Sequence, residues 1–431
     1  MGGHAETMHQ LVDHLFRREF GRVVSRLAGV FGAHRLDMVE DAVQFAMLQA
    51  LQLWPHKGAP ENPQAWLMRV AGNRALDLVK GEHKVRFYEG EDETALKEYV
   101  EELPLASSAD GYRCPEEVAD EQLALMFVCC HPALPRPASV ALTLKVVCGF
   151  GVEEIARAFL MTEGAVSQRL VRAKRLIREQ RITFEVPGPS ALRERLDAVL
   201  EVLYLLFTEG YAPTAGDQLI KAELCDEAIR LAELLTLNRV TAQPECEALL
   251  AMMLFQAARF ESRINAAGEL LLLEQQDRGR WNQSMIGRGL LHLERAARGK
   301  RLTSYHLQAE IAAIHASSNE FNLTDWKHIL ALYDLLMLMQ PTPIVSINLA
   351  IAVSQVEGPE AGLLALKVIS CDDYLERYPF LPMAEGEFHC RLGNVDAAAH
   401  CFSRALDLAR TEPERRFIKA KLSSMATVRL S

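Results

Sequence analysis

Basic and amide side chains concentrate in residues 151–176, inside a chain whose net charge is −10. The pattern there predicts two helices joined by a tight turn. The first helix carries an apolar stripe at helical spacing, formed by Val152, Ile155, Ala156 and Phe159. Thr162 is the expected N-cap of the second helix, because its hydroxyl can accept from backbone N–H groups two or three residues on. This arrangement predicts a helix-turn-helix, whose second helix enters a DNA groove.

The second helix separates into an apolar and a polar side. Its inward residues are expected to be Val166, Leu170 and Ala173. Ser167, Gln168 and Arg169 lie early in the helix, where such motifs meet base edges. The later cations are expected to contact phosphates, which adds affinity without sequence information; they are Arg172, Lys174, Arg175 and Arg178. The competing interpretation is a solvated basic helix with no role in DNA binding.

Length and composition limit the class of protein. A chain of 431 residues with 49% hydrophobic residues suggests about three domains with substantial cores. The nine cysteines are scattered and form no CxxC pair, which favours a reducing compartment over a disulfide framework. No signal segment or membrane span is recognisable, so we expect a cytoplasmic protein without a membrane partner. The modest acidity argues against bulk coating of nucleic acid but permits a local basic helix.

The chain divides into four pieces, and the predicted fold class is all-α. Two small helical domains are expected over residues 8–86 and 122–184, joined by an acidic linker over residues 87–121. In that linker the carboxylates far outnumber the two opposing cations, Lys97 and Arg113. Residues 182–189 contain prolines and a glycine that interrupt any helix. A large helical domain is expected over residues 190–431.

The end of the chain suggests helical repeats. Gly358 and Gly393 each separate an apolar helix from an alanine-rich one. Their separation is close to the tetratricopeptide period of about 34 residues. One such pair is compatible with an array, whereas residues 190–340 fit an irregular helical bundle equally well.

The N-terminal piece combines an acidic helix with an aromatic one. Residues 36–51 predict an amphipathic helix with acid near its start, which offers a docking face for a basic partner. A turn-rich loop from Pro55 to Pro63 precedes a second helix. That helix presents Trp66 among cationic and amide side chains, a combination that suits single-stranded DNA through stacking and phosphate contact. The alternative is a core tryptophan beside a solvated face.

Taken in order, these motifs resemble an extracytoplasmic-function sigma factor. The resemblance rests on Asp41 with Gln44, Trp54-Pro55, Asn62-Pro63 with Trp66-Leu67, Asn73-Arg74 with Asp77, and the later helix-turn-helix. It covers residues 8–181. Three further segments resemble the subgroup with a large tetratricopeptide-like C-terminal domain; they are residues 125–134, 276–281 and 324–334. Phe45, Gln49 and Gln52 depart from the family pattern on the polymerase-facing helix.

The resemblance implies contacts with core RNA polymerase, at its β′ coiled coil and β flap, and with promoter DNA. The implied polymerase-binding residues are Asp37, Glu40, Asp41 and Gln44. The Pro55–Asn62 loop is implied to hold a flipped minus-ten base. The residues implied to line single-stranded minus-ten DNA are Asn62, Trp66, Arg69, Asn73, Arg74, Asp77 and Lys80. Those implied to contact double-stranded minus-thirty-five DNA are Thr162, Glu163, Ser167, Gln168, Arg169, Arg172, Lys174, Arg175 and Arg178.

The resemblance also implies that the C-terminal domain controls activity, through intramolecular contacts with the sigma domains. The acidic linker either follows the polymerase's RNA-exit or active-site path or is a plain tether. The expected function is an alternative sigma factor that acts by binding, without enzymatic activity, cofactor or metal. Cys129-Cys130-His131 predicts a buried thiol pair in preference to a metal site, since no second cluster completes four ligands. The alternative function is a ligand- or partner-responsive helix-turn-helix regulator that acts without polymerase.

Overall fold

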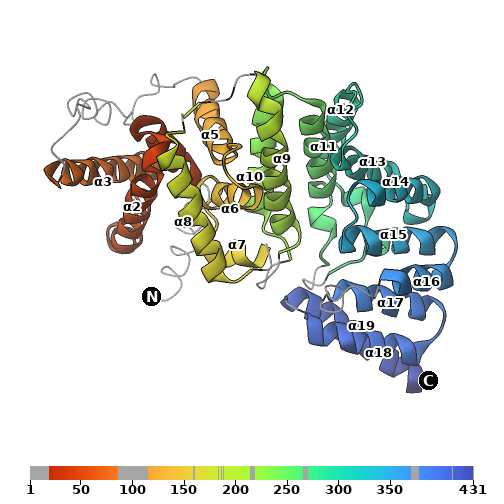
Figure 1. The fold of residues 1–431 in the computed structure, drawn as a ribbon. Helices are drawn as coiled ribbons and strands as arrows, with labels where there is room; N and C mark the ends of the chain where they lie inside the picture. Colours follow the sequence, from red (N-terminus) through yellow and green to blue (C-terminus); the bar gives the residue numbers. More distant parts are fainter. Residues whose placement is uncertain are drawn as a thin grey trace. The chain divides into compact units, whose positions relative to one another are not determined.

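The computed structural model describes most of the chain as helices (Figure 1). The described residues are 19–85, 115–158, 161–182, 184–185, 187, 189–213, 219–265, 270–369, 378–409 and 411–430. Within them the only β-type pairing is an isolated bridge between Ile264 and Leu270. The predicted all-α fold class is therefore confirmed.

The chain forms two compact units. The first comprises residues 1–206 with 237–241, and the second comprises 207–236 with 242–431. The division falls inside one helix, α9 (Pro189–Tyr211), and not in the connector that precedes it. Each unit is described separately below.

The first unit begins with one helix and the helical hairpin that follows it. A helix over residues 19–31 leads through η1 (Ala33–Arg35) into α2 (Leu36–Lys57) and α3 (Pro63–Val85). Apolar side chains with no more than 1% exposure form the centre of this group: Val24, Leu27, Val39, Val43, Leu67 and Ala71. These helices carry most of the residues predicted to contact polymerase and minus-ten DNA.

The first unit continues with four shorter helices and α9. They are α5 (Pro115–Cys129), α6 (Arg136–Val146), α7 (Val152–Ala158) and α8 (Glu163–Glu179). Gly21 lies against the end of α6, where a Cβ would overlap the Val147 carbonyl oxygen. Helix α5 begins inside the segment predicted as a linker, and the rest of that segment, residues 87–114, lies outside the described residues. The expected path of the linker is therefore outside the described part of the chain.

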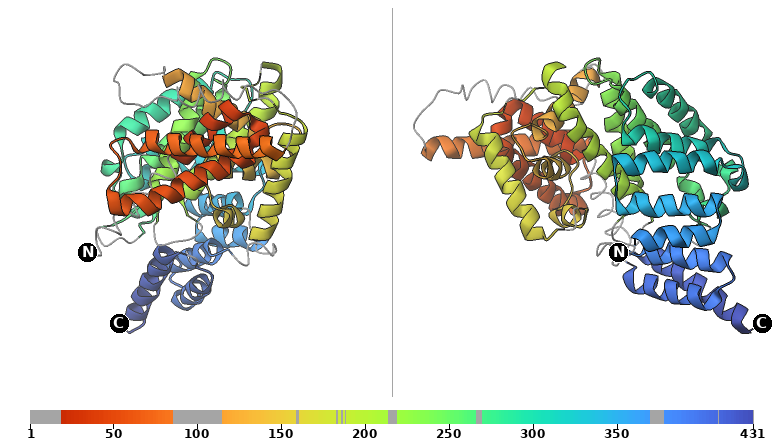
Figure 2. Two further views of the ribbon diagram at one scale, coloured as in Figure 1. Left: turned by 90° about the vertical axis from the view of Figure 1, so that its left-hand side faces the viewer. Right: turned by 45° about the vertical axis from the view of Figure 1, so that its right-hand side comes forward.

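The second unit is a succession of helices, seen as stacked ribbons from α11 to α19 in the right panel of Figure 2. It contains α10 (Ala222–Leu237), α11 (Pro244–Ala257), α12 (Gln283–Ala296), α13 (Ser304–Ser317), α14 (Trp326–Met339), α15 (Pro343–Val356), α16 (Pro359–Ile369), α17 (Phe380–Arg391), α18 (Val395–Leu408) and α19 (Glu412–Leu430). Short 3-10 turns connect several of these helices. No helix among the described residues is both long and apolar enough to cross a bilayer.

Glycine turns join two of the predicted helix pairs. Gly358 lies between α15 and α16 at φ 101°, and Gly393 lies between α17 and α18 at φ 74°. Residues other than glycine rarely adopt this left-handed region. Inside α17, a Cβ on Gly386 would lie 2.9 Å from the Phe402 ring, so glycine lets α17 and α18 approach closely. The sequence prediction of helix–glycine turn–helix is confirmed at both positions.

Candidate nucleic-acid interface

Helices α7 and α8 have the local structure expected of a helix-turn-helix. The Thr162 hydroxyl accepts a hydrogen bond from the Ala165 amide at 3.3 Å, which confirms the predicted N-cap. Val166, Leu170 and Ala173 are buried as predicted, and Ile177 extends this stripe. In α7, Ile155 and Ala156 of the predicted stripe are buried and Val152 is half-buried, while Phe159 lies outside the described residues. The spacing of apolar residues in α8 is thus sufficient to predict which face of this helix is buried.

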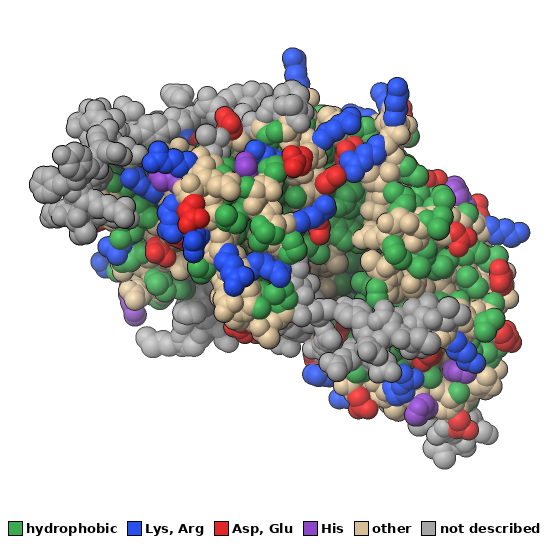
Figure 3. Space-filling view, in the orientation of Figure 1, with side chains coloured by type: hydrophobic (Ala, Val, Ile, Leu, Met, Phe, Trp, Pro, Cys, Tyr) green, Lys and Arg blue, Asp and Glu red, His purple; other side chains and the backbone are tan. Residues whose placement is uncertain are grey.

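The opposite face of α8 is polar and open. Ser167, Gln168, Arg172, Arg175 and Arg178 are exposed, and Arg169 is half-buried. Arg175 pairs with Glu179 one turn on, at 2.7 Å, and both side chains are more than half exposed. An exposed pair of this kind is screened by solvent and adds little to stability, so it leaves the guanidinium available to a phosphate. Lys and Arg side chains lie at several places on the surface where α8 lies, with acidic, apolar and other side chains between them (Figure 3).

Helix α3 carries most of the predicted minus-ten residues. Arg69, Asn73, Arg74 and Asp77 are exposed, whereas Trp66 and Lys80 are half-buried. The Trp66 ring meets the buried Trp54 ring edge-on, with 5.4 Å between centroids. The Arg74 guanidinium lies 5.0 Å above the Phe45 ring, so the residue that departs from the family pattern holds a predicted DNA contact. The structure brings these side chains together on one helix.

Asn62 has a structural role at the start of α3. Its Oδ1 accepts from the Ala65 amide at 3.0 Å, which satisfies a backbone donor that the helix itself leaves free. The preceding loop is shorter than predicted, because α2 continues through Pro55 to Lys57. A proline lacks the N–H that bonds to residue i−4, so α2 continues at the cost of one helical hydrogen bond, and the Gly58 N–H then closes the last turn on the Trp54 carbonyl. The loop therefore starts at Gly58, at φ 81°.

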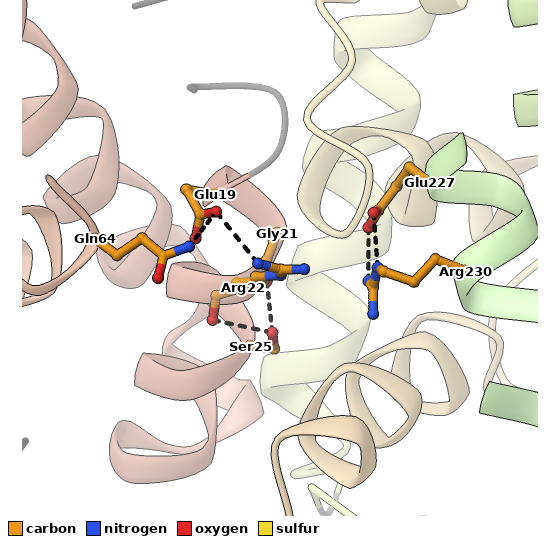
Figure 4. A network of polar contacts seen from close by, with 7 residues as sticks. All are labelled: Glu19, Gly21, Arg22, Ser25, Gln64, Glu227 and Arg230. Atoms are coloured by element: carbon orange, nitrogen blue, oxygen red, sulfur yellow. Dashed lines mark hydrogen bonds and ion pairs between the residues drawn. The ribbon is translucent and has the colours of Figure 1, made fainter. Parts of the chain in front are cut away.

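Sequence reasoning missed a polar network that ties the helix over residues 19–31 to α3 (Figure 4). Glu19 is 3% exposed and accepts from Gln64 at 2.5 Å and from Arg22 at 3.3 Å. Ser25 completes the network by donating to the Gly21 carbonyl at 2.5 Å. Figure 4 also shows a separate pair within α10, Glu227 with Arg230. No motif marks Glu19, whose partner Gln64 lies 45 residues away.

Comparisons with known proteins agree with this geometry. Residues 124–177, which include α7 and all but the last two residues of α8, match the family Sigma-70, region 4. Residues 195–297 match a family of unknown function, DUF6596. The chain is 40% identical over 400 residues to Uncharacterized protein R00370 of Rhizobium meliloti (strain 1021), covering 91% of this chain and 90% of that protein. The chain belongs to the same family as R00370.

A second relative carries a functional name. The chain is 26% identical over 194 residues to the Probable RNA polymerase sigma factor RfaY of Xanthomonas campestris pv. campestris, covering 41% of this chain and 46% of that protein. No solved structure matches the chain. Together with the region 4 match, this likeness supports a DNA-binding factor of the sigma-70 family. Below, region 4 denotes residues 124–177.

The region 4 helix α8 turns one of its predicted phosphate contacts inward. Lys174 Nζ lies 2.6 Å from Glu40 Oε2 and 3.1 Å from Asp37 Oδ1, both on α2. Burial lowers the pKa of the Lys174 ammonium, but the Glu40 and Asp37 carboxylates outweigh it and raise its pKa above the ordinary value. Lys174 is therefore charged and paired with residues predicted to bind polymerase.

The predicted polymerase-binding residues differ in accessibility. Glu40 is 3% exposed, and its carboxylate also lies 3.7 Å from Lys145 Nζ. Gln44 donates to Glu40 Oε1 at 3.2 Å. Asp37, Asp41 and Gln44 are exposed, and Asp37 has a second, looser partner in Arg178 at 3.7 Å. The four residues thus lie together on α2, with only Glu40 hidden from solvent.

The thiols at the start of region 4 are buried, as predicted. Cys129 and Cys130 are 0% and 4% exposed. Burial raises the pKa of Cys129 well above its ordinary value and that of Cys130 to about 11. A thiol with a raised pKa is a weak nucleophile, so packing is the role that the geometry supports. His131 accepts from the Ala133 amide at 3.2 Å and closes the turn after α5.

Proposed function

We propose that this chain is an alternative sigma factor, which binds core RNA polymerase and directs promoter-specific initiation of transcription. The observation that carries the proposal is the exposed polar face of α8 in a region 4 domain. Such a face fits the major groove, where side chains distinguish all four base pairs. The likeness to a probable sigma factor supports the same conclusion.

Within this proposal, residues at different positions on α8 contact different parts of the DNA. Ser167, Gln168 and Arg169 lie in its first two turns and read minus-thirty-five bases. Thr162 and Glu163 flank them at the N-terminus of the helix, where backbone N–H groups favour a phosphate. Arg172, Arg175 and Arg178 neutralise phosphates further along. Each neutralised phosphate makes the affinity for duplex DNA fall by about 0.9 log unit per log unit of salt.

In the same proposal, the hairpin of α2 and α3 binds single-stranded minus-ten DNA and contacts core polymerase. Trp66, Arg69, Asn73 and Arg74 line the melted minus-ten strand, where a ring and cations hold unstacked bases. Asn62, Asp77 and Lys80 border this surface. Asp41 and Gln44 are the most accessible polymerase contacts, with Asp37 beside them.

The finer assignment concerns the second unit. We propose that it is the tetratricopeptide-like extension of an extracytoplasmic-function subgroup and that it controls activity through intramolecular contacts. The two glycine-turned helix pairs support this assignment, because repeat proteins stack such pairs. The proposed location is the cytoplasm, where polymerase and promoter DNA are found.

Run-off transcription tests the function. Purified core polymerase, this chain and a pool of genomic promoter fragments are expected to give discrete start sites that require the chain. Trp66→Ala and Arg169→Ala are expected to weaken those products, while Arg298→Ala, in the turn that follows α12, serves as a surface control. Absence of both transcript and core complex, together with DNA binding by the chain alone, would instead identify a regulator that acts without polymerase.

A further inference from the structure

We propose that the second unit contains a binding site for a small oxyanion that carries about two negative charges, built around Arg259, Arg263 and Arg278. All three arginines lie in the segment that joins α11 to α12, inside one compact unit. A phosphate monoester and a dicarboxylate share the required chemistry. The inference goes beyond the proposed function and does not depend on it.

The three guanidinium groups gather around two aromatic rings. Those of Arg259 and Arg278 each lie 5.2 Å from the centroid of the Trp281 ring. That of Arg263 lies 3.9 Å from the centroid of the Tyr211 ring, at the end of α9. Arg278 is 8% exposed and Arg263 is 9% exposed, and arginine is rarely buried to this degree without a partner of opposite charge. The acceptors of these side chains therefore decide whether their charge is neutralised.

Two of the arginines bind the C-terminal ends of helices. Arg263 Nη1 donates to the carbonyl of Tyr211, the last residue of α9, at 2.6 Å. Arg278 Nη1 donates to the His315 carbonyl at 2.8 Å and to the Ser318 carbonyl at 2.7 Å, at the end of α13. The C-terminal end of a helix carries about half a negative charge. The two helix ends therefore offset about one of the three positive charges.

The other polar contacts of the cluster leave its charge uncompensated. Arg259 donates to the side-chain oxygens of Gln256 and Gln276, both at 3.1 Å. Asp277, next to Arg278 in the sequence, is exposed and accepts from the amide two residues on, at 3.0 Å. No carboxylate in the described part of the chain forms an ion pair with any of the three arginines. About two positive charges thus lack a counter-ion, and burial of a charge without one is costly.

Neighbouring groups respond to this uncompensated charge. Burial lowers the pKa of the Arg278 guanidinium, and the like charge of Arg259 lowers it further. Burial also lowers the pKa of Arg259; Tyr211 opposes this change, and Arg263 adds to it. Burial raises the pKa of the Tyr211 hydroxyl, but Arg259 and Arg263 outweigh it and leave that pKa below its ordinary value. An anion at the cluster would offset the repulsion among the three guanidinium groups.

The cluster also retains donors for such an anion. Arg263 uses one guanidinium nitrogen, Nη1, within the described residues, which leaves Nε and Nη2. Arg278 Nε and Trp281 Nε1 are buried and have no acceptor in the part of the chain that the structure describes. Unpaired buried donors are uncommon in folded proteins and indicate an ion or a water that completes them.

The oxyanion is best placed beside Arg259 and Arg263. Arg259 is half-buried, so a small ligand can reach it from solvent. Each guanidinium donates in a planar fork that matches the oxygens of a carboxylate or a phosphate. The charge of Arg278, which shares the Trp281 ring with Arg259, adds to the attraction.

Isothermal titration calorimetry of the full-length chain tests the site. The probes are inorganic phosphate and succinate at about pH 8, where phosphate is mainly a dianion, with sodium chloride holding the ionic strength constant. One or both dianions are expected to bind at one site per chain. Arg259→Met and Arg263→Met keep the apolar stem but remove the charge, and each is expected to weaken binding about tenfold or more, because charge-assisted hydrogen bonds are strong. Arg298→Met, in the turn that follows α12, removes an exposed charge outside the cluster and should leave the dissociation constant unchanged.

Thermal unfolding monitored by circular dichroism establishes that each variant folds. In the wild type, but not in the folded methionine variants, saturating phosphate or succinate should raise the unfolding midpoint. If a methionine variant does not fold, Arg263→Lys retains the charge but loses the fork, and it is expected to bind more weakly than the wild type. The site is overturned if neither dianion binds beyond chloride, or if wild type and folded arginine variants bind equally well. Neither polymerase nor DNA enters the experiment, so failure of this site and failure of the proposed function are distinguishable.

Discussion

The indole of Trp66 stands edge-on to that of Trp54, with ring centroids 5.4 Å apart and planes at 65°. Trp54 is 2% exposed and belongs to the core, whereas Trp66 is half-buried at the surface. The proposed stacking ring is therefore oriented by a core ring on the neighbouring helix. Edge-to-face pairs contribute about 0.5–1.5 kcal/mol beyond the area that they bury.

This pair predicts separable effects on stability and function. Trp54→Ala should lower the free energy of unfolding by about 3–5 kcal/mol, the usual cost of a buried aromatic. Trp66→Ala should cost less stability but lower open-complex yield. Denaturant unfolding and permanganate footprinting of the minus-ten region measure the two. Equal losses of stability from both variants would argue against a surface role for Trp66.

The Thr162 cap sets the start of the recognition helix. Thr162→Ala should lower the free energy of unfolding by about 0.5–2 kcal/mol, because the Ala165 amide loses its acceptor. Thr162→Ser keeps a hydroxyl and should retain most of that stability. Thermal unfolding of both variants beside the wild type checks the cap. If alanine and serine behave alike, the capping bond is not contributing.

Substitution of Arg172 tests whether α8 contacts DNA phosphates. It is exposed and has no ion-pair partner among the described residues. Arg172→Ala should reduce the slope of log affinity against log salt by about 0.9, the release expected for one phosphate. The measurement is holoenzyme binding to the recovered promoter at several salt concentrations. Arg298→Ala, in the turn that follows α12, should leave the slope unchanged.

Close helix packing in the second unit makes Gly386 sensitive to substitution. Gly386→Ala places a methyl 2.9 Å from the Phe402 ring and should cost about 1–3 kcal/mol of unfolding free energy. Gly287→Ala, in α12, has open space around its Cβ. There the better helix propensity of alanine should be neutral or stabilising by up to about 1 kcal/mol. Chemical unfolding distinguishes these two outcomes.

His315 predicts a pH dependence of stability. Burial, with Arg259 and Arg278 nearby, lowers its pKa from 6.5 to about 3. Between those values the unfolded chain binds a proton that the folded chain does not, so stability falls as pH decreases through this window. The contribution is up to about 1.4 kcal/mol per pH unit. The stability difference between wild type and His315→Gln should shrink by this slope from pH 6.5 to 4.5, and a constant difference would refute it.

Local features of the candidate site could be predicted from the sequence, whereas contacts between distant segments could not. The Thr162 cap and the inward set of Val166, Leu170 and Ala173 depend on spacing within one helix, which periodicity reports. The turns at Gly358 and Gly393 are local for the same reason. The pairing of Lys174 with Glu40 joins residues 134 positions apart, and no pattern in either helix encodes it.

The structure differs from the sequence prediction at the boundaries of two helices, and each difference has a physical explanation. Helix α2 runs past Pro55 at the cost of one helical hydrogen bond and ends where Gly58, at φ 81°, turns the chain. Helix α5 begins at Pro115, within the predicted linker, because proline is well tolerated in a first helical turn. Composition suggested a linker there, since Glu116, Glu117 and Asp120 are acidic; acid also suits a helix N-terminus.

The contact between Gly21 and the Val147 carbonyl limits how such a chain can be recombined. A side chain at position 21 is excluded by a main-chain atom, not by a side chain that a second substitution could trim. A chimera that takes residues 19–85 from one homologue and region 4 from another must therefore keep glycine at this position and the same backbone course after α6. Residues 19–85 and region 4 are therefore expected to be inherited together, although we propose different binding partners for them.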